Sequence, residues 1–193
     1  MRNLRVFLQS VSAWGAFAVP TGIYGLASPL IYPALRRAMG DHRAQRTMRR
    51  AVHRYCRLYF PILTTIVPPL EVRFDPSQGV KRVPDRGTIY VVNHSGTLDI
   101  VFLLAHIEDF HILGKQSLAR VPVFGWALES MGVVFTEREN RFEAREVFED
   151  LCQLVLKGEN ILAFPQGHRL PQWRLKDIKR GIFRVALATG APV

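Results

Sequence analysis

The stretch TIYVVNHSGTLD (residues 88–99) decides how the central part of the chain is interpreted. Its first five residues have the β-branched and aromatic composition of a buried strand. His94 comes just after this run, and Asp99 comes five residues later. Five residues of α-helix turn through about 500°, so the two side chains would not share a face of one helix. We therefore expect His94 in the turn after a strand and Asp99 early in the next helix, reaching back toward it.

A histidine paired with a carboxylate has a defined chemistry. The carboxylate fixes the tautomer through one imidazole nitrogen, and the other nitrogen can then accept a proton. Ser95 is an adjacent hydroxyl, but neighbouring residues rarely have the geometry of a nucleophile and its base, and no G-x-S-x-G elbow is present. We interpret His94 as a general base for a hydroxyl that the substrate brings. For this motif alone, the alternative is a strand-end histidine that caps a helix, with Asp99 in the first turns of that helix.

Outward from this stretch, short apolar runs alternate with helical patterns. Strands are expected at residues 70–74, 87–92, 110–113, 132–136 and 160–164, and helices at 97–107, 117–131, 140–157 and 178–189. The alternation predicts an α/β fold in which helices flank a central mixed sheet. Neither a G-x-G-x-x-G nor a Walker sequence is present, which argues against a nucleotide-binding Rossmann domain.

Charge is concentrated at the N-terminal end of the chain. Residues 1–60 contain ten arginines and one acid, whereas residues 61–193 contain 16 basic and 15 acidic residues. A basic arm of this kind binds either nucleic acid or an anionic membrane. The arginines do not interleave with aromatic residues as a nucleic-acid stacking platform requires, so we expect no nucleic-acid partner.

The segment next to these arginines favours a membrane. Residues 6–35 carry no charged side chain and are long enough to cross a bilayer, which takes about 20 residues, although Pro20 interrupts them. A kinked span and a shallow helical hairpin in one leaflet both fit, and a cleaved signal peptide is the alternative. Residues 41–66 predict an amphipathic helix, kinked at Pro61, with an arginine stripe suited to a headgroup layer. A core-packing helix with a solvated basic face is the alternative for this segment.

These features divide the chain into two parts. We expect a membrane-associated helical segment over residues 1–67, closed by Pro68-Pro69, and a catalytic domain over residues 68–193. Two cysteines provide neither a disulfide framework nor a metal site, and they fit a reducing compartment. We therefore expect no metal, and an active site on the cytoplasmic side of a membrane, the inner membrane if the source is bacterial.

Two further strand ends carry basic residues. The run GVVFTER (132–138) ends in Arg138, and the run ILAFPQGHR (161–169) ends in Arg169. Ligands of α/β sheets gather where such loops leave the strands. An arginine fork matches phosphate oxygens in bidentate fashion. Two arginines near a histidine base predict an anionic, phosphorylated substrate.

The motifs, their order and their spacing resemble those of the glycerolipid acyltransferase family. NHSGTLD (93–99) resembles the family's first motif, histidine and aspartate separated by four residues. The stretch from Gly114-Lys115 to Trp126 is similar to the linker before the second motif, GVVFTER resembles the second, and FPQGHR (164–169) resembles the third. GIF (181–183) and GAPV (190–193) resemble the approach to the fourth motif and its beginning. The chain ends inside that motif, so we expect the catalytic domain to be truncated there.

The resemblance implies transfer of a fatty acyl group from an acyl thioester to the free hydroxyl of a lysophospholipid, with 1-acylglycerol-3-phosphate as acceptor and phosphatidic acid as product. His94 and Asp99 would be catalytic. The substrate-binding residues it implies are Lys115, Arg138, Gln166, Gly167 and Arg169. The acyl donor would be acyl-CoA or acyl carrier protein, acting as a substrate, with no other cofactor. The membrane surface, with its anionic lipids, would be the remaining partner.

Two positions depart from the family pattern. Gln166 stands where the family usually has glutamate, and His168 stands where it usually has threonine. Glutamine keeps the shape of glutamate, but it loses the charge and gains an NH2 donor. Two alternatives therefore stay open: an acyltransferase that uses another lipid acceptor, and a non-catalytic family member that binds an anionic lipid.

Overall fold

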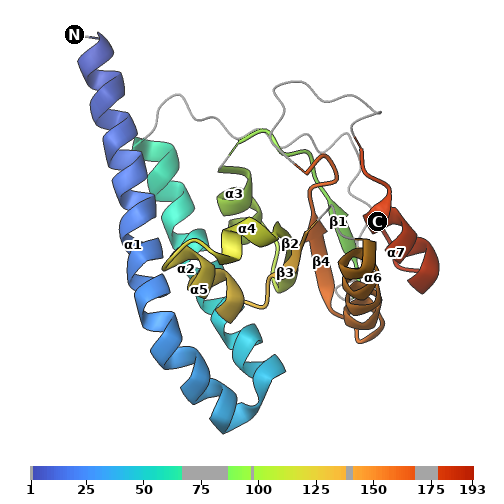
Figure 1. Cartoon of the computed structure of the whole chain (residues 1–193). Helices are drawn as coiled ribbons and strands as arrows, with labels where there is room; N and C mark the ends of the chain where they lie inside the picture. The colour runs from blue at the N-terminus through green and yellow to red at the C-terminus, as the bar shows by residue number, and fades with distance from the viewer. Residues whose placement is uncertain (1, 67–86, 97, 138–140, 168–177) are drawn as a thin grey trace.

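The computed structural model describes residues 2–66, 87–96, 98–137, 141–167 and 178–193. Its elements are α1 (Arg2–Met39), α2 (Asp41–Ile66), β1 (Ile89–Val91), α3 (Leu98–His106), β2 (Phe110–Lys115), α4 (Gln116–Ala119), α5 (Phe124–Ser130), β3 (Val134–Thr136), α6 (Arg141–Leu156), β4 (Asn160–Ala163) and α7 (Gly181–Thr189). The strands form a central sheet with α6 and α7 on one side and the other long helices on the opposite side (Figure 1). The predicted α/β architecture is confirmed.

The sheet has the strand order β1-β4-β2-β3, and all three pairings among the described strands are parallel. The prediction of a mixed sheet is therefore wrong for this part of the chain. Each strand is joined to the next through at least one helix, and such a connection returns the chain to the same edge of the sheet. The carboxyl ends of the four described strands consequently lie along one edge, where β1 leads to His94.

Most predicted elements are found close to their expected bounds, but the helix expected at 117–131 is two helices. α4 ends at Ala119 and α5 begins at Phe124, with Pro122 between them. Proline disfavours helical conformation in the residue before it and lacks an N–H to donate. Val123 has φ = 67°, a conformation that a β-branched residue rarely adopts. The strand expected at 70–74 and the domain boundary at Pro68-Pro69 lie outside the described residues.

Hydrophobic clusters on both faces of the sheet hold these layers together. On one face, Ile89 and Ile161 pack against Leu151 of α6 and Val185 of α7. On the other face, a cluster around Leu162 includes residues of α3 and α5. The central strands are therefore buried on both sides, as a parallel sheet requires.

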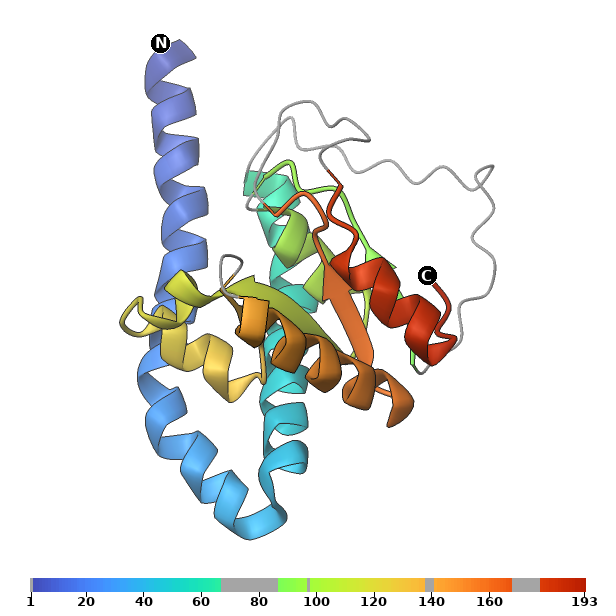
Figure 2. The same ribbon diagram turned by 45° about the vertical axis from the view of Figure 1, so that its right-hand side comes forward.

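The first two helices form an antiparallel hairpin that lies against the sheet domain (Figures 1 and 2). Gly40 joins them with φ = 83°, a left-handed turn that glycine adopts readily. The run expected to be interrupted at Pro20 is one helix, α1, which contains three prolines. Within the part of the chain that the structure describes, no helix is both long enough and apolar enough to cross a membrane.

α2 is the amphipathic helix that the sequence predicted, but its contacts are largely internal. Its apolar face, including Phe60 and Leu63, packs against Val101 of α3. On its basic face, Arg50 and Arg57 lie 3.8 Å and 3.5 Å from acidic side chains in the loop between α3 and β2. Part of the arginine stripe assigned to a headgroup layer therefore contacts protein carboxylates, and the alternative of a core-packing helix describes the apolar face.

A buried ion-pair network joins α2 to the sheet at the edge opposite His94. The Arg49 guanidinium, 3% exposed, lies 3.2 Å from Asp109 and 3.1 Å from Glu159. Glu159 also lies 2.8 Å from the His42 ring and 3.3 Å from the His111 ring. The His111 imidazole, followed by His42 and Arg49, outweighs burial and lowers the pKa of Glu159 to about 2.

We expect Glu159→Gln to destabilise the fold at neutral pH. Removing one partner of a buried ion pair leaves the other charge uncompensated, but Arg49 retains its ion pair with Asp109. We therefore expect a loss of about 1–3 kcal/mol in the free energy of unfolding. A carboxylate whose folded-state pKa is depressed stabilises the fold above its unfolded pKa and loses that effect as pH falls. The difference between parent and variant should therefore be full above about pH 4.5 and shrink toward pH 2.

Denaturant unfolding at a series of pH values measures this difference. Glu149→Gln is the matched control, because Glu149 forms an exposed pair with Arg145 along α6. That control should change stability little. A Glu159→Gln variant as stable as the parent at pH 7 would contradict a stabilising role for the network.

Candidate active site

The end of β1 places His94 at the carboxyl edge of the sheet. The Val92 N–H still donates to the Ala163 carbonyl oxygen on β4 at 3.1 Å, and the chain then leaves the sheet before α3 begins at Leu98. Asp99 lies in the first turn of α3, and its Oδ2 is 3.0 Å from His94 Nδ1. The arrangement expected from the sequence is confirmed: a histidine in the turn and a carboxylate reaching back to it.

The Asp99 carboxylate has a second role at the same oxygen. Oδ2 accepts hydrogen bonds from the backbone N–H groups of Ser95 at 2.7 Å and Gly96 at 2.9 Å. Burial raises the pKa of Asp99, but hydrogen bonds from the Gly96 N–H and the other two donors outweigh it and hold the pKa below its usual range. Asp99 is therefore ionised at neutral pH, and the two backbone N–H groups that it binds lie in the turn before α3.

The geometry defines the chemistry that His94 can perform. With Nδ1 directed to a carboxylate, Nδ1 carries the proton and Nε2 keeps its lone pair. The side chain is 16% exposed, and its ring stacks on Phe164, with ring centroids 4.3 Å apart and planes inclined by 30°. An imidazole held in one tautomer and one orientation, with Nε2 unprotonated, is suited to remove a proton from a hydroxyl.

The loop after β4 also contacts His94. Gln166 Oε1 accepts a hydrogen bond from the His94 backbone N–H at 2.9 Å, and Gln166 Nε2 donates to Asn93 Oδ1 at 3.3 Å. Gln166 is 1% exposed. Gly167 has φ = 79° and donates its N–H to the Phe164 carbonyl, so a tight turn positions this loop.

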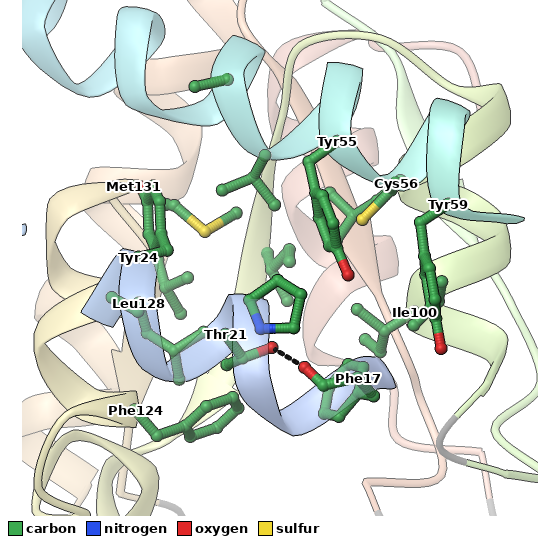
Figure 3. A pocket seen from close by; sticks show the side chains of 18 of the residues that line it. Phe17, Thr21, Tyr24, Tyr55, Cys56, Tyr59, Ile100, Phe124, Leu128 and Met131 are labelled. Atoms are coloured by element: carbon green, nitrogen blue, oxygen red, sulfur yellow. Dashed lines mark hydrogen bonds between the residues drawn. The ribbon is translucent and has the colours of Figure 1, made fainter. Parts of the chain in front are cut away.

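His94 also lines an apolar cavity of about 540 Å³, a volume typical of small-molecule sites. Figure 3 shows side chains from four helices around it: Phe17, Thr21 and Tyr24 of α1, Tyr55, Cys56 and Tyr59 of α2, Ile100 of α3, and Phe124 and Leu128 of α5, with Met131 just beyond α5. Polar groups on the wall are partly satisfied internally, since the Thr21 hydroxyl donates to the Phe17 carbonyl and the Tyr24 hydroxyl lies 3.0 Å from Ser130 Oγ. The cavity is thus suited to an aliphatic chain that reaches the histidine.

The structure describes some of the remaining predicted site residues and not others. Lys115 is exposed at the carboxyl end of β2, on the same edge of the sheet as His94, and it pairs in register with Thr136 of β3. Arg138 follows Thr136 by two residues, but Arg138, His168 and Arg169 lie outside the described residues. Substrate binding by the basic residues therefore stays a prediction. Gln166 and Gly167 lie beside His94, and the contacts of Gln166 are with protein.

Sequence comparison assigns this arrangement to a family. The acyltransferase family model matches residues 76–193, which include His94, Asp99, Gln166 and Gly167. The chain belongs to the acyltransferase family. The matched region contains the four described strands and the helices between them.

Several family members are similar to this chain. The chloroplastic 1-acyl-sn-glycerol-3-phosphate acyltransferase BAT2 of Brassica napus is 36% identical over 60% of the chain and 34% of that protein. The enzyme of the same name from Pseudomonas aeruginosa is 29% identical over 74% of the chain and 54% of that protein. The chain thus spans about a third to a half of the length of these relatives. The crystal structure of the acyltransferase PlsC from Thermotoga maritima matches the whole chain and 73% of its own chain, with a TM-score of 0.68 and 25% identity.

Sequence reasoning missed three contributors to the site. Phe164 stacks on the His94 ring, Asn93 orients Gln166, and the N-terminal helices form walls of the cavity. The aromatic residue two positions before Gln166 offered a weak local signal for the first. No local pattern indicated the cavity, because the apolar positions of α1 fit a lipid environment equally well.

Proposed function

We propose that the chain is the catalytic part of an acyltransferase that moves a fatty acyl group from a thioester to the free hydroxyl of 1-acylglycerol-3-phosphate, giving phosphatidic acid. The observation that carries the proposal is the His94–Asp99 pair on the wall of an apolar cavity. The names of the similar family members support the choice of acceptor.

The residues supply a complete acyl-transfer step. His94 Nε2 takes the proton of the acceptor hydroxyl as its oxygen attacks the thioester carbonyl. The C–S bond then breaks, an ester forms, and the leaving thiolate takes the proton from the imidazolium. Asp99 keeps Nδ1 protonated and stabilises the transient positive charge on the ring. No acyl-enzyme is required, so neither Ser95 nor a cysteine has to act as a nucleophile.

Binding of the two substrates follows from the surroundings of His94. The cavity takes the fatty acyl chain, because its lining is mainly apolar and it extends to the reacting histidine. The acceptor phosphate is bound at the carboxyl edge of the sheet by basic residues, with Lys115, Arg138 and Arg169 as the candidates and Gly167 giving close backbone approach. The donor is acyl-CoA or acyl carrier protein, and no further cofactor takes part.

An acyl-transfer assay tests this function. Purified protein is incubated with lysophosphatidate and either acyl-CoA or acylated carrier protein, and ester formation and thiol release are both measured. A panel that includes lysophosphatidylcholine, lysophosphatidylethanolamine and lysophosphatidylglycerol tests the acceptor, because Gln166 and His168 depart from the family pattern. Turnover only on another acceptor would change the assigned substrate, and absence of turnover on all of them would favour the non-catalytic lipid-binding alternative.

We also propose that the outer face of α1 attaches the enzyme to the membrane in which its acceptor resides, with the active site on the cytoplasmic side. Large apolar side chains recur along this helix at three-, four- and five-residue spacing and are 53–78% exposed: Phe7, Val11, Trp14, Val19, Ile23, Leu26 and Leu30. An apolar row of this size on a surface indicates contact with a lipid or a partner. Both cysteines are free thiols, which fits a reducing compartment.

Replacing Val19, Leu26 and Leu30 together by serine should weaken binding to anionic vesicles at least about tenfold, because each buried aliphatic side chain contributes roughly 1.5–3 kcal/mol. These positions are exposed, so the fold should be retained. Vesicle co-sedimentation measures the binding. The control is Leu187→Ser, since Leu187 is 85% exposed on α7, on the far side of the molecule from α1 (Figure 2). Equal binding by the triple variant and the parent would exclude this face as the attachment surface.

A further inference from the structure

Gln166 lies where the family resemblance predicts a residue that reads the substrate, yet both of its polar atoms contact protein. Its oxygen accepts from the His94 backbone N–H and its nitrogen donates to Asn93 Oδ1, at 2.9 Å and 3.3 Å. The side chain is 1% exposed, among the most buried polar groups in the described residues. A residue in this environment has little surface left for a substrate.

The orientation of the Gln166 amide follows from its partners. A backbone N–H can only donate, so the atom facing His94 N must be the amide oxygen. The atom facing Asn93 is then the NH2 group, and it requires an acceptor there. Asn93 is exposed, and its own amide supplies that acceptor in one orientation and a donor in the other. The side chain at position 93 therefore determines which side chain at position 166 is satisfied.

These bonds complete a set of restraints on the proposed base. Asp99 holds Nδ1, Phe164 holds the face of the ring, and Gln166 holds the main chain of the same residue. Phe164 and Gln166 belong to one short stretch after β4, whereas Asp99 comes from α3. His94 is thus held by two elements that lie far apart in the chain, and general-base catalysis depends on such positioning.

We propose that Gln166 is a positioning residue that fixes the His94 main chain without contacting the acceptor. The Asn93 amide can either accept or donate, so it can pair with an amide or with a carboxylate at position 166. This inference rests on the proposed function in one respect only, namely that His94 is the base. In this inference, the glutamine that replaces the family's glutamate at position 166 does not determine which lipid acceptor is used.

Each of two single substitutions should keep a donor–acceptor pair between positions 93 and 166, whereas their combination should not. In Gln166→Glu, one oxygen still accepts from His94 N–H, and Asn93 can rotate its amide to donate to the other. In Asn93→Asp, a carboxylate oxygen accepts from Gln166 Nε2. In the double variant two carboxylates face each other across a contact that is 3.3 Å in the parent, and they cannot both be ionised without repulsion. Protonation of one carboxylate restores a donor between them.

The test is a double-mutant cycle on the full chain, with Asn93→Asp, Gln166→Glu and the double variant compared with the parent from pH 5.5 to 8.5. kcat and KM are measured for lysophosphatidate and acyl-CoA, and thermal unfolding is followed at the same pH values. We expect each single variant to lower kcat by about fivefold or less, and the double variant to lose at least about tenfold more than the product of the two at pH 8. The kcat of the double variant, relative to that of the parent, should recover as pH falls. KM for lysophosphatidate should change less than kcat.

Gln166→Leu completes the design, because it keeps approximate side-chain size and removes both hydrogen bonds. It should lower kcat and leave KM for the acceptor nearly as in the parent. A rise in KM for lysophosphatidate at constant kcat in either position-166 variant would overturn the proposal, since it would place Gln166 against the acceptor. Additive effects in the cycle at every pH would also overturn it.

The two proposals fail in distinguishable ways. If the parent shows no acyl transfer to any acceptor, the proposed function fails, and the melting temperatures still report on the contact. pH-dependent, non-additive loss of thermal stability in the double variant supports the coupling between Asn93 and Gln166 in that case. Additive melting temperatures overturn the coupling whether or not the enzyme is active.

Discussion

Replacing His94 by alanine is expected to lower kcat for acyl transfer by about 10²–10⁴-fold, the usual contribution of a general base. The expectation follows from the 3.0 Å contact between Nδ1 and Asp99, which leaves Nε2 as the proton acceptor, and from the position of the ring on the cavity wall. KM for the acceptor should change much less, because the ring acts on the reacting hydroxyl and the phosphate is bound elsewhere. Steady-state kinetics with lysophosphatidate and acyl-CoA measure both quantities.

His106→Ala is the matched control, since His106 is an exposed histidine at the C-terminal end of α3, the helix that carries Asp99. It should retain most of the parent's kcat. Circular dichroism should show both variants folded, because His94 lies in the turn beyond the end of β1 and outside the helices and strands of the fold. A His94→Ala variant with turnover within a few-fold of the parent would contradict the general-base mechanism.

The parts of this site that the sequence predicted depend on residues close together in the chain. A β-branched run predicts β1, apolar periodicity predicts α3, and only five residues separate His94 from Asp99, so their contact depends on one turn. The division of residues 117–131 into two helices also has a local signal, Pro122, which outweighs the helical periodicity around it.

The parts that the sequence did not predict depend on residues far apart in the chain. Tyr24 and Ser130 meet beside the cavity although 106 residues separate them, and Gln166 reaches His94 across 72 residues. The arginines of α2 show the same limit. Their periodicity predicts a basic face, but whether that face meets lipid or carboxylate depends on Asp109 and Glu159, which periodicity cannot place beside it.

The second large effect is expected for Asp99→Asn, which should lower kcat by about 10²–10³-fold while leaving the fold intact. One oxygen, Oδ2, accepts all three hydrogen bonds from His94, Ser95 and Gly96. Asparagine can place its single oxygen there, so it can still accept hydrogen bonds from the turn before α3 and from His94 Nδ1. What it cannot supply is the negative charge, which stabilises the imidazolium formed as the acceptor hydroxyl loses its proton.

Asp99→Ala separates the two roles of this carboxylate. Alanine removes the backbone hydrogen bonds as well as the charge, so it should lower the melting temperature, with a loss of about 1.5–3 kcal/mol, as is usual for hydrogen bonds to a charged group. Asparagine should keep most of that stability and still lose most of the activity. Thermal unfolding and kcat measured on the same two variants decide the matter. If Asp99→Asn turned over nearly as fast as the parent while Asp99→Ala was destabilised, Asp99 would only hold the turn before α3, its charge would not serve catalysis, and another group would have to stabilise the His94 imidazolium.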